Sequence, residues 1–374
     1  MDWTAFRSLF PITQHWAFLD HAAIAPLPQP AVEAFQHYCS SLSQHGVAAV
    51  KEWLDRITYV RQLAAKLINA PNADDVYFVP NTTHGISVVA EGYPWQPGDN
   101  VVLAAEEYPA NQYPWMNLCH RGVQVRRVPS RGSRIAIDDL RSAMDHRTRV
   151  LTVSAVEFAS GFRQDLGTLG AICRKRDIFF FVDAIQSLGV IPLDVQQVPI
   201  DALSADGHKW MLGPEGAGIG YIRRDWVERL HPIGVGAFSV IHPFDFSTID
   251  FTLKPHAGRW EGGAYNVAGL SALGASLELL LTIGIDTICS RVLELTDALC
   301  DRASSKGWKV FSSRDPAEKS GIVSLIHPSL PAREVVSRCR AAGVVINSRA
   351  ERVRISPHAY NTLDELEQVF DATR

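Results

Sequence analysis

Little in this sequence points to nucleic acids, disulfides, metals or membranes. The 374-residue chain has a formal net charge of −4, without the basic excess that usually accompanies nucleic-acid binding. Its six cysteines show no CxxC spacing, which argues against a disulfide framework or a zinc site and favours a reducing cytoplasm. The N-terminus lacks the basic start and apolar run of a signal peptide, and no apolar run reaches the ~18 residues of a membrane span. We therefore expect a cytoplasmic protein without nucleic-acid, membrane or metal partners.

What the sequence does contain is typical of a large globular protein. Hydrophobic residues make up 47% of the chain and charged residues 20%, a balance that excludes an intrinsically disordered protein. The length is sufficient for two domains. Internal repeats, low-complexity tracts and charge blocks are absent.

Short strand-like runs alternate with helical patterns through much of the chain. These β-branched and apolar runs cover residues 76–80, 100–105, 123–129, 149–156, 178–184, 200–205 and 218–224. The alternation predicts crossover connections and an α/β fold with a mostly parallel, seven-stranded sheet. Because the run at 178–182 is apolar at every position, we expect both faces of this sheet to be covered.

Changes in composition divide the chain into four expected parts. Residues 1–30 end in a proline-rich segment and indicate an irregular N-terminal arm. Residues 31–235 contain the seven runs and form the expected large domain. Residues 236–264 are rich in glycine, proline and aromatic residues, which predicts a connector loop. Residues 265–374 mix helical and strand-like patterns, which predicts a smaller α+β domain.

Two residues near the middle of the chain suggest a cofactor. Asp183 ends one strand-like run, and Lys209 follows the next run within the sequence Asp-Gly-His-Lys-Trp. In open α/β sheets, ligands lie beyond the carboxyl ends of the strands. An amine and an acid facing a pyridine nitrogen are the groups that pyridoxal 5′-phosphate (PLP) requires. Taken singly, such an acid is more commonly a helix cap and such a lysine a solvated charge, so the other parts of the site decide.

Candidates for binding the phosphate and the ring occur at suitable positions. Thr82 and Thr83 stand where a strand-like run meets a helical pattern, and helix N-termini bind phosphate through free N–H groups. His208 is a further candidate donor to the phosphate. Tyr108 follows another strand end and is a candidate for stacking on the ring. Each of these residues also has an ordinary structural interpretation, as a cap, a structural histidine or a surface tyrosine.

A carboxylate site is suggested by arginines near the C-terminus. Arg352 and Arg354 occupy alternate positions of a strand-like run, and Arg349 precedes them. A guanidinium pairs bidentately with a carboxylate, so one or more of these residues are candidates for binding a substrate. The default interpretation of each is a solvated surface charge.

Several segments, taken in order, resemble one enzyme family. VDAIQSLGVIPLDV followed by DGHKWMLGPEG resembles the class V aminotransferases, PLP-dependent enzymes that include cysteine desulfurases and isopenicillin-N-epimerase-like proteins. The other matching segments are LDHAAIAPLP, PNTTHGI, EEYPANQYPW, SGFRQDL, RWEGGAYN and VRISPHAYNT. Together they span residues 19–362, and the ordered set is specific for the family but much less so for the reaction. The resemblance implies a PLP-dependent transferase fold of type I and a homodimer in which RWEGGAYN reaches the partner's cofactor.

The resemblance also implies a role for each candidate. Lys209 would be the Schiff-base lysine, Asp183 the partner of the pyridine nitrogen, and Gln186 a donor to the phenolic oxygen of the ring. Tyr108 would take the stacking place often filled by histidine, and Arg354 would bind the substrate carboxylate. The full set implied to contact the cofactor is Thr82, Thr83, Tyr108, Asp183, Gln186, His208 and Lys209.

The chain departs from the desulfurase pattern at several positions. Asp206 replaces a serine, and we expect it to point away from the phosphate, which its charge would repel. Ala264 stands in place of a threonine and Phe158 in place of an asparagine. Residues 340–353 contain no cysteine, whereas a persulfide-forming desulfurase needs a thiolate there. Cys339 lies in a helical pattern, where a small buried role is expected.

These observations favour a PLP-dependent enzyme that acts at Cα or Cβ of a small amino acid. Lys209, once displaced by substrate, would serve as the general base. Transamination, C–S cleavage, epimerisation and β-elimination share the first steps, and the sequence leaves these reactions open. The missing thiol favours transaminase-type or lyase-type chemistry over persulfide formation. The alternatives are a C–S lyase for cysteine or cystine without an enzymic cysteine, and a binding or regulatory protein without turnover, against which the intact Lys209–Asp183 pair argues.

Overall fold

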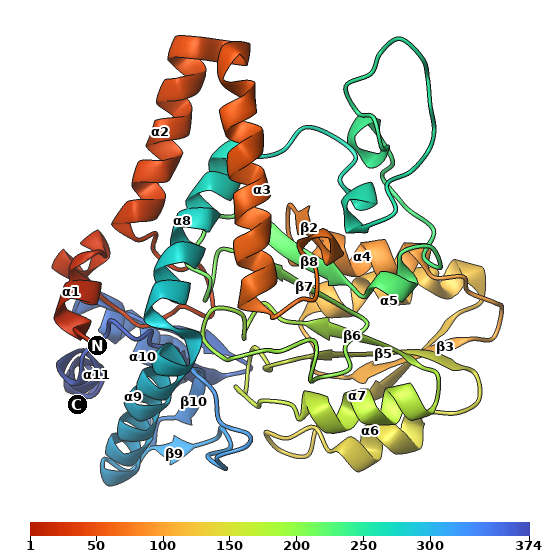
Figure 1. The fold of residues 1–374 in the computed structure, drawn as a ribbon. Helices are drawn as coiled ribbons and strands as arrows, with labels where there is room; N and C mark the ends of the chain where they lie inside the picture. The colour runs from red at the N-terminus through yellow and green to blue at the C-terminus, as the bar shows by residue number, and fades with distance from the viewer.

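The computed structural model describes all 374 residues, and its centre is a seven-stranded sheet (Figure 1). The strands lie in the order β2-β8-β7-β6-β5-β3-β4. Their bounds are β2 Val76–Val79, β3 Asn100–Ala104, β4 Gln124–Val128, β5 Thr148–Ser154, β6 Phe179–Asp183, β7 Ala202–Asp206 and β8 Gly218–Ile222. Only β8 is antiparallel to its neighbours, β2 and β7. The expected mostly parallel sheet of seven strands is therefore confirmed.

Both faces of this sheet are buried, as the apolar run in β6 predicts. Phe180 and Val182 point to a core shared with α3 (Val50–Leu67), α6 (Ile137–Ala143) and α7 (Leu166–Lys175). Phe179 and Phe181 point to a second core shared with α4 (Thr82–Gly92) and α5 (Tyr113–Met116). Successive side chains of a strand alternate between the faces, so a strand buried on both sides must be apolar throughout.

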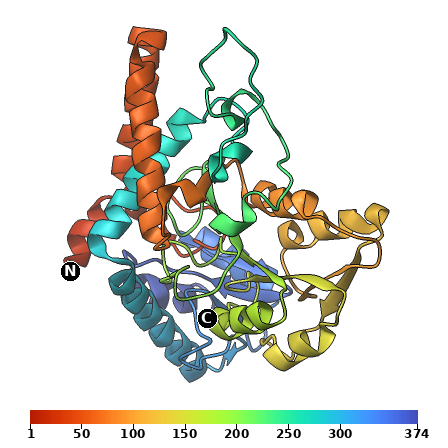
Figure 2. The same ribbon diagram turned by 45° about the vertical axis from the view of Figure 1, so that its right-hand side comes forward.

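A helical hairpin projects from this body. It consists of α2 (Gln29–His45) and α3, and Figure 2 shows its outer end projecting beyond the sheet, against which the inner part of α3 packs. α8 (Val267–Ile283) packs against the base of both helices. Leu270, Leu273 and Leu277 of α8 lie in the core beneath the large sheet. α8 thus packs with the large domain although the sequence assigns it to the smaller one, and the domain boundaries themselves stay a prediction.

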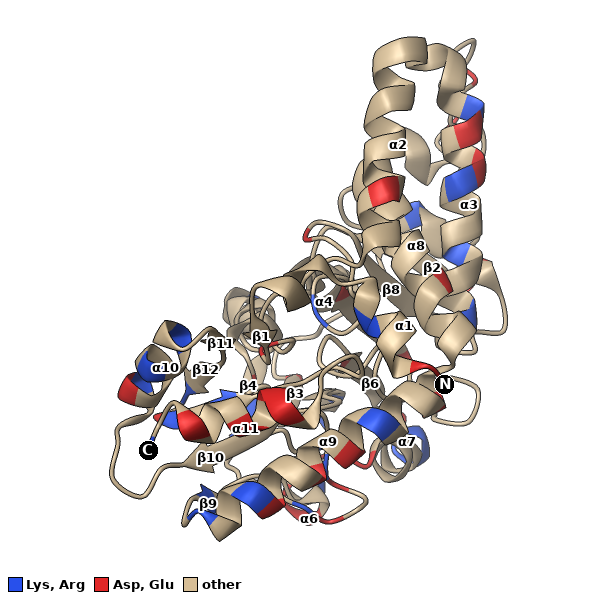
Figure 3. Cartoon of the chain, turned by 90° about the vertical axis from the view of Figure 1, so that its left-hand side faces the viewer, with Lys and Arg blue, Asp and Glu red and all other residues tan.

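The C-terminal region contains a four-stranded antiparallel sheet in the order β12-β13-β10-β9. These strands are β9 Lys309–Val310, β10 Val323–Ile326, β12 Asn347–Arg349 and β13 Arg352–Ile355. The remaining helices are α9 Ile285–Ser305, α10 Ala332–Ala341 and α11 Leu363–Asp371. Figure 3 shows acidic and basic residues interspersed along α3 and α9. The expected mixture of helices and strands in this region is confirmed.

The N-terminal segment is more regular than the sequence indicates. Residues Trp3–Ser8 form α1, and Ala17–Phe18 form β1, which pairs in parallel with β11 (Val344–Val345). The ring of Phe10 stacks on that of Tyr360 with the centroids 4.0 Å apart. The expectation of an irregular arm is wrong for these stretches, because contacts with the distant C-terminal region order segments too short to show a period of their own.

Residues 236–264 form a long connector that is irregular apart from two 3-10 turns, at Ala237–Ser239 and Ala257–Trp260, as expected. Its outer part exposes large apolar side chains, among them Phe246 at 82% and Ile249 at 99%. No single helix is long and apolar enough to cross a membrane. α8 and α9 reach that threshold only when taken together, and they bend by 82° where they meet.

Candidate active site

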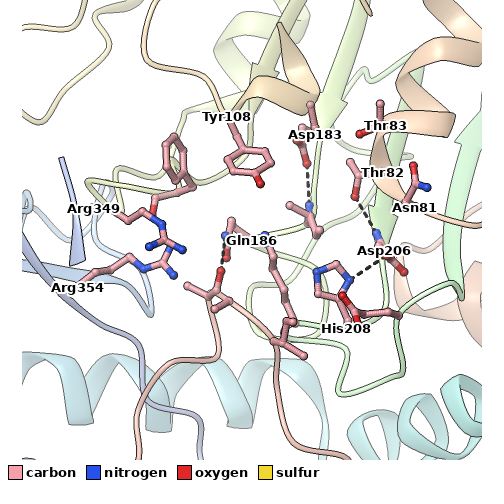
Figure 4. A pocket seen from close by; sticks show the side chains of 18 residues that line it. Asn81, Thr82, Thr83, Tyr108, Asp183, Gln186, Asp206, His208, Arg349 and Arg354 are labelled. Carbon is pink, nitrogen blue, oxygen red and sulfur yellow. Dashed lines mark hydrogen bonds and ion pairs between the residues drawn. The ribbon is translucent and has the colours of Figure 1, made fainter. Parts of the chain in front are cut away.

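The predicted site residues surround one cavity of about 350 Å³ (Figure 4). It lies where β5, β6 and β7 end and α4 begins, with the C-terminal sheet and the N-terminal segment closing its sides. The carboxyl ends of these three parallel strands share one sheet edge, which is why residues distant in sequence meet there. The predicted residues that line it are Thr82, Thr83, Tyr108, Asp183, Gln186, His208, Lys209 and Arg354. The structure brings all eight together, while their individual roles stay predictions.

Asp183 and Lys209 both line this cavity, and each affects the other's pKa through its charge without direct contact. Burial raises the pKa of Asp183 to about 6, and the charge of Lys209 opposes that rise. Burial lowers the pKa of Lys209 to about 8, and Asp183 opposes that fall. Asp183 accepts a hydrogen bond from the Ile185 N–H at Oδ1 (3.1 Å), and its Oδ2 has no partner in the chain. The site therefore holds a lysine whose amine is more readily deprotonated than usual, and a carboxylate with a free oxygen.

The N-terminus of α4 faces a cluster suited to a phosphate group. Asn81 caps the helix by accepting from the His84 N–H, and the first N–H groups of a helix have no partner within it. The Asp206 N–H donates to Thr82 Oγ1 (3.0 Å), so the hydroxyl hydrogen of Thr82 is available to a ligand. The donor groups therefore fit an anion, on geometry that is independent of any sequence resemblance.

Asp206 corrects one expectation. It lines the cavity instead of pointing away. Its Oδ2 lies 2.9 Å from Nδ1 of His208, and its Oδ1 accepts from the Gly207 N–H at 2.8 Å. Both carboxylate oxygens therefore lie against nitrogen atoms of neighbouring residues, which offsets repulsion between this carboxylate and an anion in the cavity.

The side-chain amide of Gln186 is held in one orientation. Its Nε2 donates to the Ala22 carbonyl (3.0 Å), and its Oε1 accepts from the indole N–H of Trp210 (2.9 Å). An indole nitrogen can only donate, so the amide cannot be flipped. One N–H of Gln186 therefore remains for a hydrogen-bond acceptor in the cavity.

Two aromatic residues form one wall. The rings of Tyr108 and Phe158 pack edge to face with centroids 5.2 Å apart, and the Tyr108 ring centroid lies 5.6 Å from Nζ of Lys209.

A buried glutamate precedes each of these aromatic residues in the sequence: Glu107 precedes Tyr108, and Glu157 precedes Phe158. Burial raises the pKa of Glu107 to about 7, and burial together with Glu107 raises the pKa of Glu157. Both shifts favour the neutral carboxyl, so this pair adds less negative charge near Asp183 than two ordinary glutamates would.

Next to the aromatic wall lies Arg354 on β13. Its Nη2 donates to Asp20 Oδ1 (3.1 Å) and its Nη1 to the Phe158 carbonyl (2.9 Å), and the side chain is 2% exposed. Arg349 also lines the cavity. Arg352 does not, since its guanidinium lies 3.8 Å from the Phe311 ring centroid and donates to Ser324.

Comparison with known proteins assigns the family. The family model described as aminotransferase class-V matches residues 17–369. The chain belongs to the class V aminotransferase family. It is 30% identical to a probable cysteine desulfurase of Methanothermobacter thermautotrophicus, over 96% of this chain and 94% of that protein. Among solved structures, cysteine desulfurase CsdA of Escherichia coli is 25% identical with a TM-score of 0.89, covering 100% of this chain and 98% of that one.

The fold of the chain also matches that of the cystine C–S lyase C-DES. That structure, a complex with cysteine persulfide, has a TM-score of 0.90 and 22% identity, over 97% of this chain and 98% of that one. A mutant of C-DES carries glycine covalently linked to its PLP cofactor. The expected family and α/β fold are confirmed, and the chain is an enzyme of the class V aminotransferase family.

None of the six cysteines of the chain lines the cavity. Cys339 is buried in α10, where burial raises its thiol pKa to about 11, in agreement with the expected packing role. In place of a cysteine-bearing loop, residues 347–355 form the tight β12–β13 hairpin.

The sequence did not indicate several residues of this site. Asn81, Ile24 and Glu215 line the cavity, and Asp20 holds Arg354 from behind. The segment LDHAAIAPLP signalled that residues 19–28 matter, but nothing in it indicated which side chain Asp20 would meet, 334 residues away. Asn81 could have been found from the sequence, since asparagine is a preferred N-cap residue and it directly precedes the two threonines.

Proposed function

We propose that this protein binds PLP in the cavity between Asp183 and Lys209 and uses it to act on Cα or Cβ of a small amino acid. The observation that carries the proposal is that one cavity is lined both by a buried acid with a free oxygen and by a lysine of lowered pKa. Bound PLP supplies an electron sink for the bonds around Cα.

Each part of the chain has a task in this proposal. Lys209 attaches the cofactor, and its amine afterwards takes and returns the proton at Cα. Asp183 keeps the pyridine nitrogen protonated, and the free N–H of Gln186 reaches the phenolic oxygen. Thr82 and Thr83 at the start of α4 hold the phosphate together with His208, whose orientation Asp206 sets. Tyr108 covers the ring, and Arg354 binds the substrate carboxylate.

The proposal includes a cytoplasmic homodimer. The connector at 236–264 exposes several large apolar side chains, and a monomer rarely leaves so many uncovered. Glu261 of this connector is buried against Arg61 with a contact of 2.7 Å, which fixes the neighbouring Gly262–Ala264 at a surface hollow. That arrangement supports the expectation that RWEGGAYN contributes to the partner's site.

The experiment is a substrate screen on protein reconstituted with PLP. Small L-amino acids are added one at a time, the absorption of the bound cofactor is followed, and products are identified for those that change it. A transaminase yields the oxo acid and a cofactor that keeps the amino group. If the wild-type protein takes up no PLP, the proposal fails at its first step.

A second candidate is a C–S lyase acting on cysteine or cystine, and the absence of a cysteine from the cavity favours it over a persulfide-forming desulfurase. Some relatives carry cysteine desulfurase or cystine lyase names. Incubation with L-cystine and L-cysteine, followed by assays for sulfide, pyruvate and alanine, separates the candidates. Pyruvate with released sulfur indicates lysis, and alanine with sulfur indicates desulfuration.

A further inference from the structure

Two segments distant from each other in the sequence hold the side-chain amide of Gln186. The carbonyl of Ala22 accepts from Nε2 at 3.0 Å, and the indole N–H of Trp210 donates to Oε1 at 2.9 Å. Ala22 is itself fixed, since its N–H donates to Oγ of Ser356 at 3.0 Å. Trp210 directly follows Lys209 in the chain. The residue that orients the amide is therefore the neighbour of the cavity lysine.

The indole of Trp210 is closely packed on all sides. Its side chain is 1% exposed, and the rings of His21 and His358 each lie with their centroids 6.0 Å from it. A Cβ at Gly321 would come within 2.5 Å of Cη2 of the indole, so this glycine makes room for the six-membered ring. Because an indole nitrogen can only donate, a fixed indole provides a fixed donor for the amide oxygen of Gln186.

The neighbours of the indole carry no charge near neutral pH. Burial lowers the pKa of His21 to about 3 and holds the pKa of His358 well below its ordinary value. Burial also raises the pKa of Tyr360, whose hydroxyl lies 2.9 Å from Nε2 of His21. The surroundings of Trp210 therefore keep one protonation state through the neutral pH range.

The cavity that Gln186 faces does contain titratable and charged side chains (Figure 4). They are the acids Asp183, Asp206 and Glu215, the bases His208, Lys209, Arg349 and Arg354, and the phenol of Tyr108. Trp210 does not line the cavity, so a substitution there leaves all of these groups in place. A change of titration in such a variant can be assigned to the amide of Gln186.

A Gln186 side chain without the indole would present the wrong atom to the cavity. Its Oε1 would become a buried acceptor with no donor, which is unfavourable. The side chain can satisfy that oxygen by turning it toward the cavity, where the phenolic oxygen of the cofactor is expected. Two acceptors would then face each other in place of a donor and an acceptor.

We propose that Trp210 is a positioning residue that acts through Gln186: its indole N–H occupies the amide oxygen, so that Gln186 donates to the phenolic oxygen of the bound cofactor. A donor stabilises the charged form of that oxygen, so the indole favours the ionised phenol over the neutral one. This inference rests on the proposed function and adds to it a residue outside the cavity that sets the protonation of the cofactor.

The test follows the absorption of protein-bound PLP as a function of pH. Trp210→Phe removes the indole N–H and keeps an aromatic ring. The midpoint pH of the absorption change should rise by roughly one unit, because the ionised phenol loses a donor. Gln186→Ala should raise the midpoint by a similar amount. The double variant should match Gln186→Ala, because a residue that acts through the amide has no effect once the amide is gone.

Trp226→Phe is the matched control. Trp226 is also buried and its indole N–H donates to Oδ1 of Asp201 at 3.1 Å, but it does not line the cavity or contact Gln186. Its midpoint should equal that of the wild type. Gln186→Glu is an independent measurement that decides the question if Trp210→Phe does not fold. It keeps an acceptor for the indole but has no second N–H, so its midpoint should also rise.

An unchanged midpoint in Trp210→Phe or in Gln186→Glu would overturn the inference. The same holds for a midpoint in the double variant above that of Gln186→Ala, or for an equal rise in Trp226→Phe. Each of these results is measured on protein that binds PLP. A wild type that takes up no PLP strikes the proposed function instead.

Discussion

The buried negative charge of Asp183 lowers the stability of the cofactor-free protein at neutral pH. Its raised pKa means that the folded state binds the proton more tightly than the unfolded state, so stability falls as the pH rises from about 4 through about 6. Asp183→Asn carries no charge and keeps an oxygen for the Ile185 N–H. Chemical denaturation should therefore find the cofactor-free variant more stable than the wild type at pH 7.5, by up to about 3 kcal/mol.

The same comparison at pH 5 provides the control, because the wild-type carboxyl is then mostly protonated in the folded state. The difference in unfolding free energy should shrink to about half its value at pH 7.5. If the wild type is at least as stable as Asp183→Asn at pH 7.5, burial of the Asp183 charge does not destabilise the cofactor-free protein.

Individual site residues differed in how far the sequence revealed them. Asp183 and Lys209 follow strand-like runs, so their place at the sheet edge came from local pattern and the rule for α/β sheets. The orientation of Asp206 did not, because its carboxylate lies against the ring of His208, while its backbone N–H donates to the hydroxyl of Thr82, 124 positions away. Electrostatic repulsion was the correct principle, but the carboxylate is satisfied by partners that one-dimensional reasoning could not place.

At the scale of elements, the packing of α4 against β7 fixes the position of the helix N-terminus that we propose binds the phosphate. A Cβ at Gly85 would lie 2.2 Å from Oγ of Ser204 and 2.6 Å from its Cβ, so α4 can approach β7 closely only with glycine there. Gly85→Ala should push the helix outward, lower stability by about 1–3 kcal/mol and raise the dissociation constant of PLP. Thermal unfolding and a PLP titration measure the two effects.

Gly167→Ala in α7 is the matched substitution. The nearest atom to its added Cβ would be Asp165 Oδ1 at 3.5 Å, an ordinary contact. It should leave PLP affinity unchanged and stabilise the helix by up to about 1 kcal/mol. Equal behaviour of the two variants would contradict the view that α4 is positioned by close packing.

The elements that the sequence did not indicate are short or depend on contacts between distant residues. α1 has six residues and α6 has seven, too few for a helical period to stand out. β1 pairs with β11, which places Ala17 beside Val344. No pattern in the sequence near either residue predicts this pairing. Longer helices such as α3 and α9 carry a clearer amphipathic period, because that periodicity accumulates over several turns.

At the scale of the whole molecule, the exposed connector bears on oligomeric state. Phe246, Ile249 and Phe251 are 82%, 99% and 71% exposed in the single chain. Sedimentation should give a mass of about twice the 41.3 kDa of one chain. Replacing Phe246 and Ile249 by serine should weaken the dimer and increase the proportion of monomer on dilution. A wild type that sediments as a monomer at micromolar concentration would contradict the homodimer.

The central claim is that Lys209 holds PLP in this cavity. The direct measurement is to reconstitute the protein with PLP, reduce it with borohydride, digest it and locate the added mass by peptide mass spectrometry. The predicted result is a stable pyridoxyl group on the peptide containing Lys209, absent from Lys209→Ala treated in parallel. A protein that stays colourless, or one whose label lies on another lysine, would contradict the account.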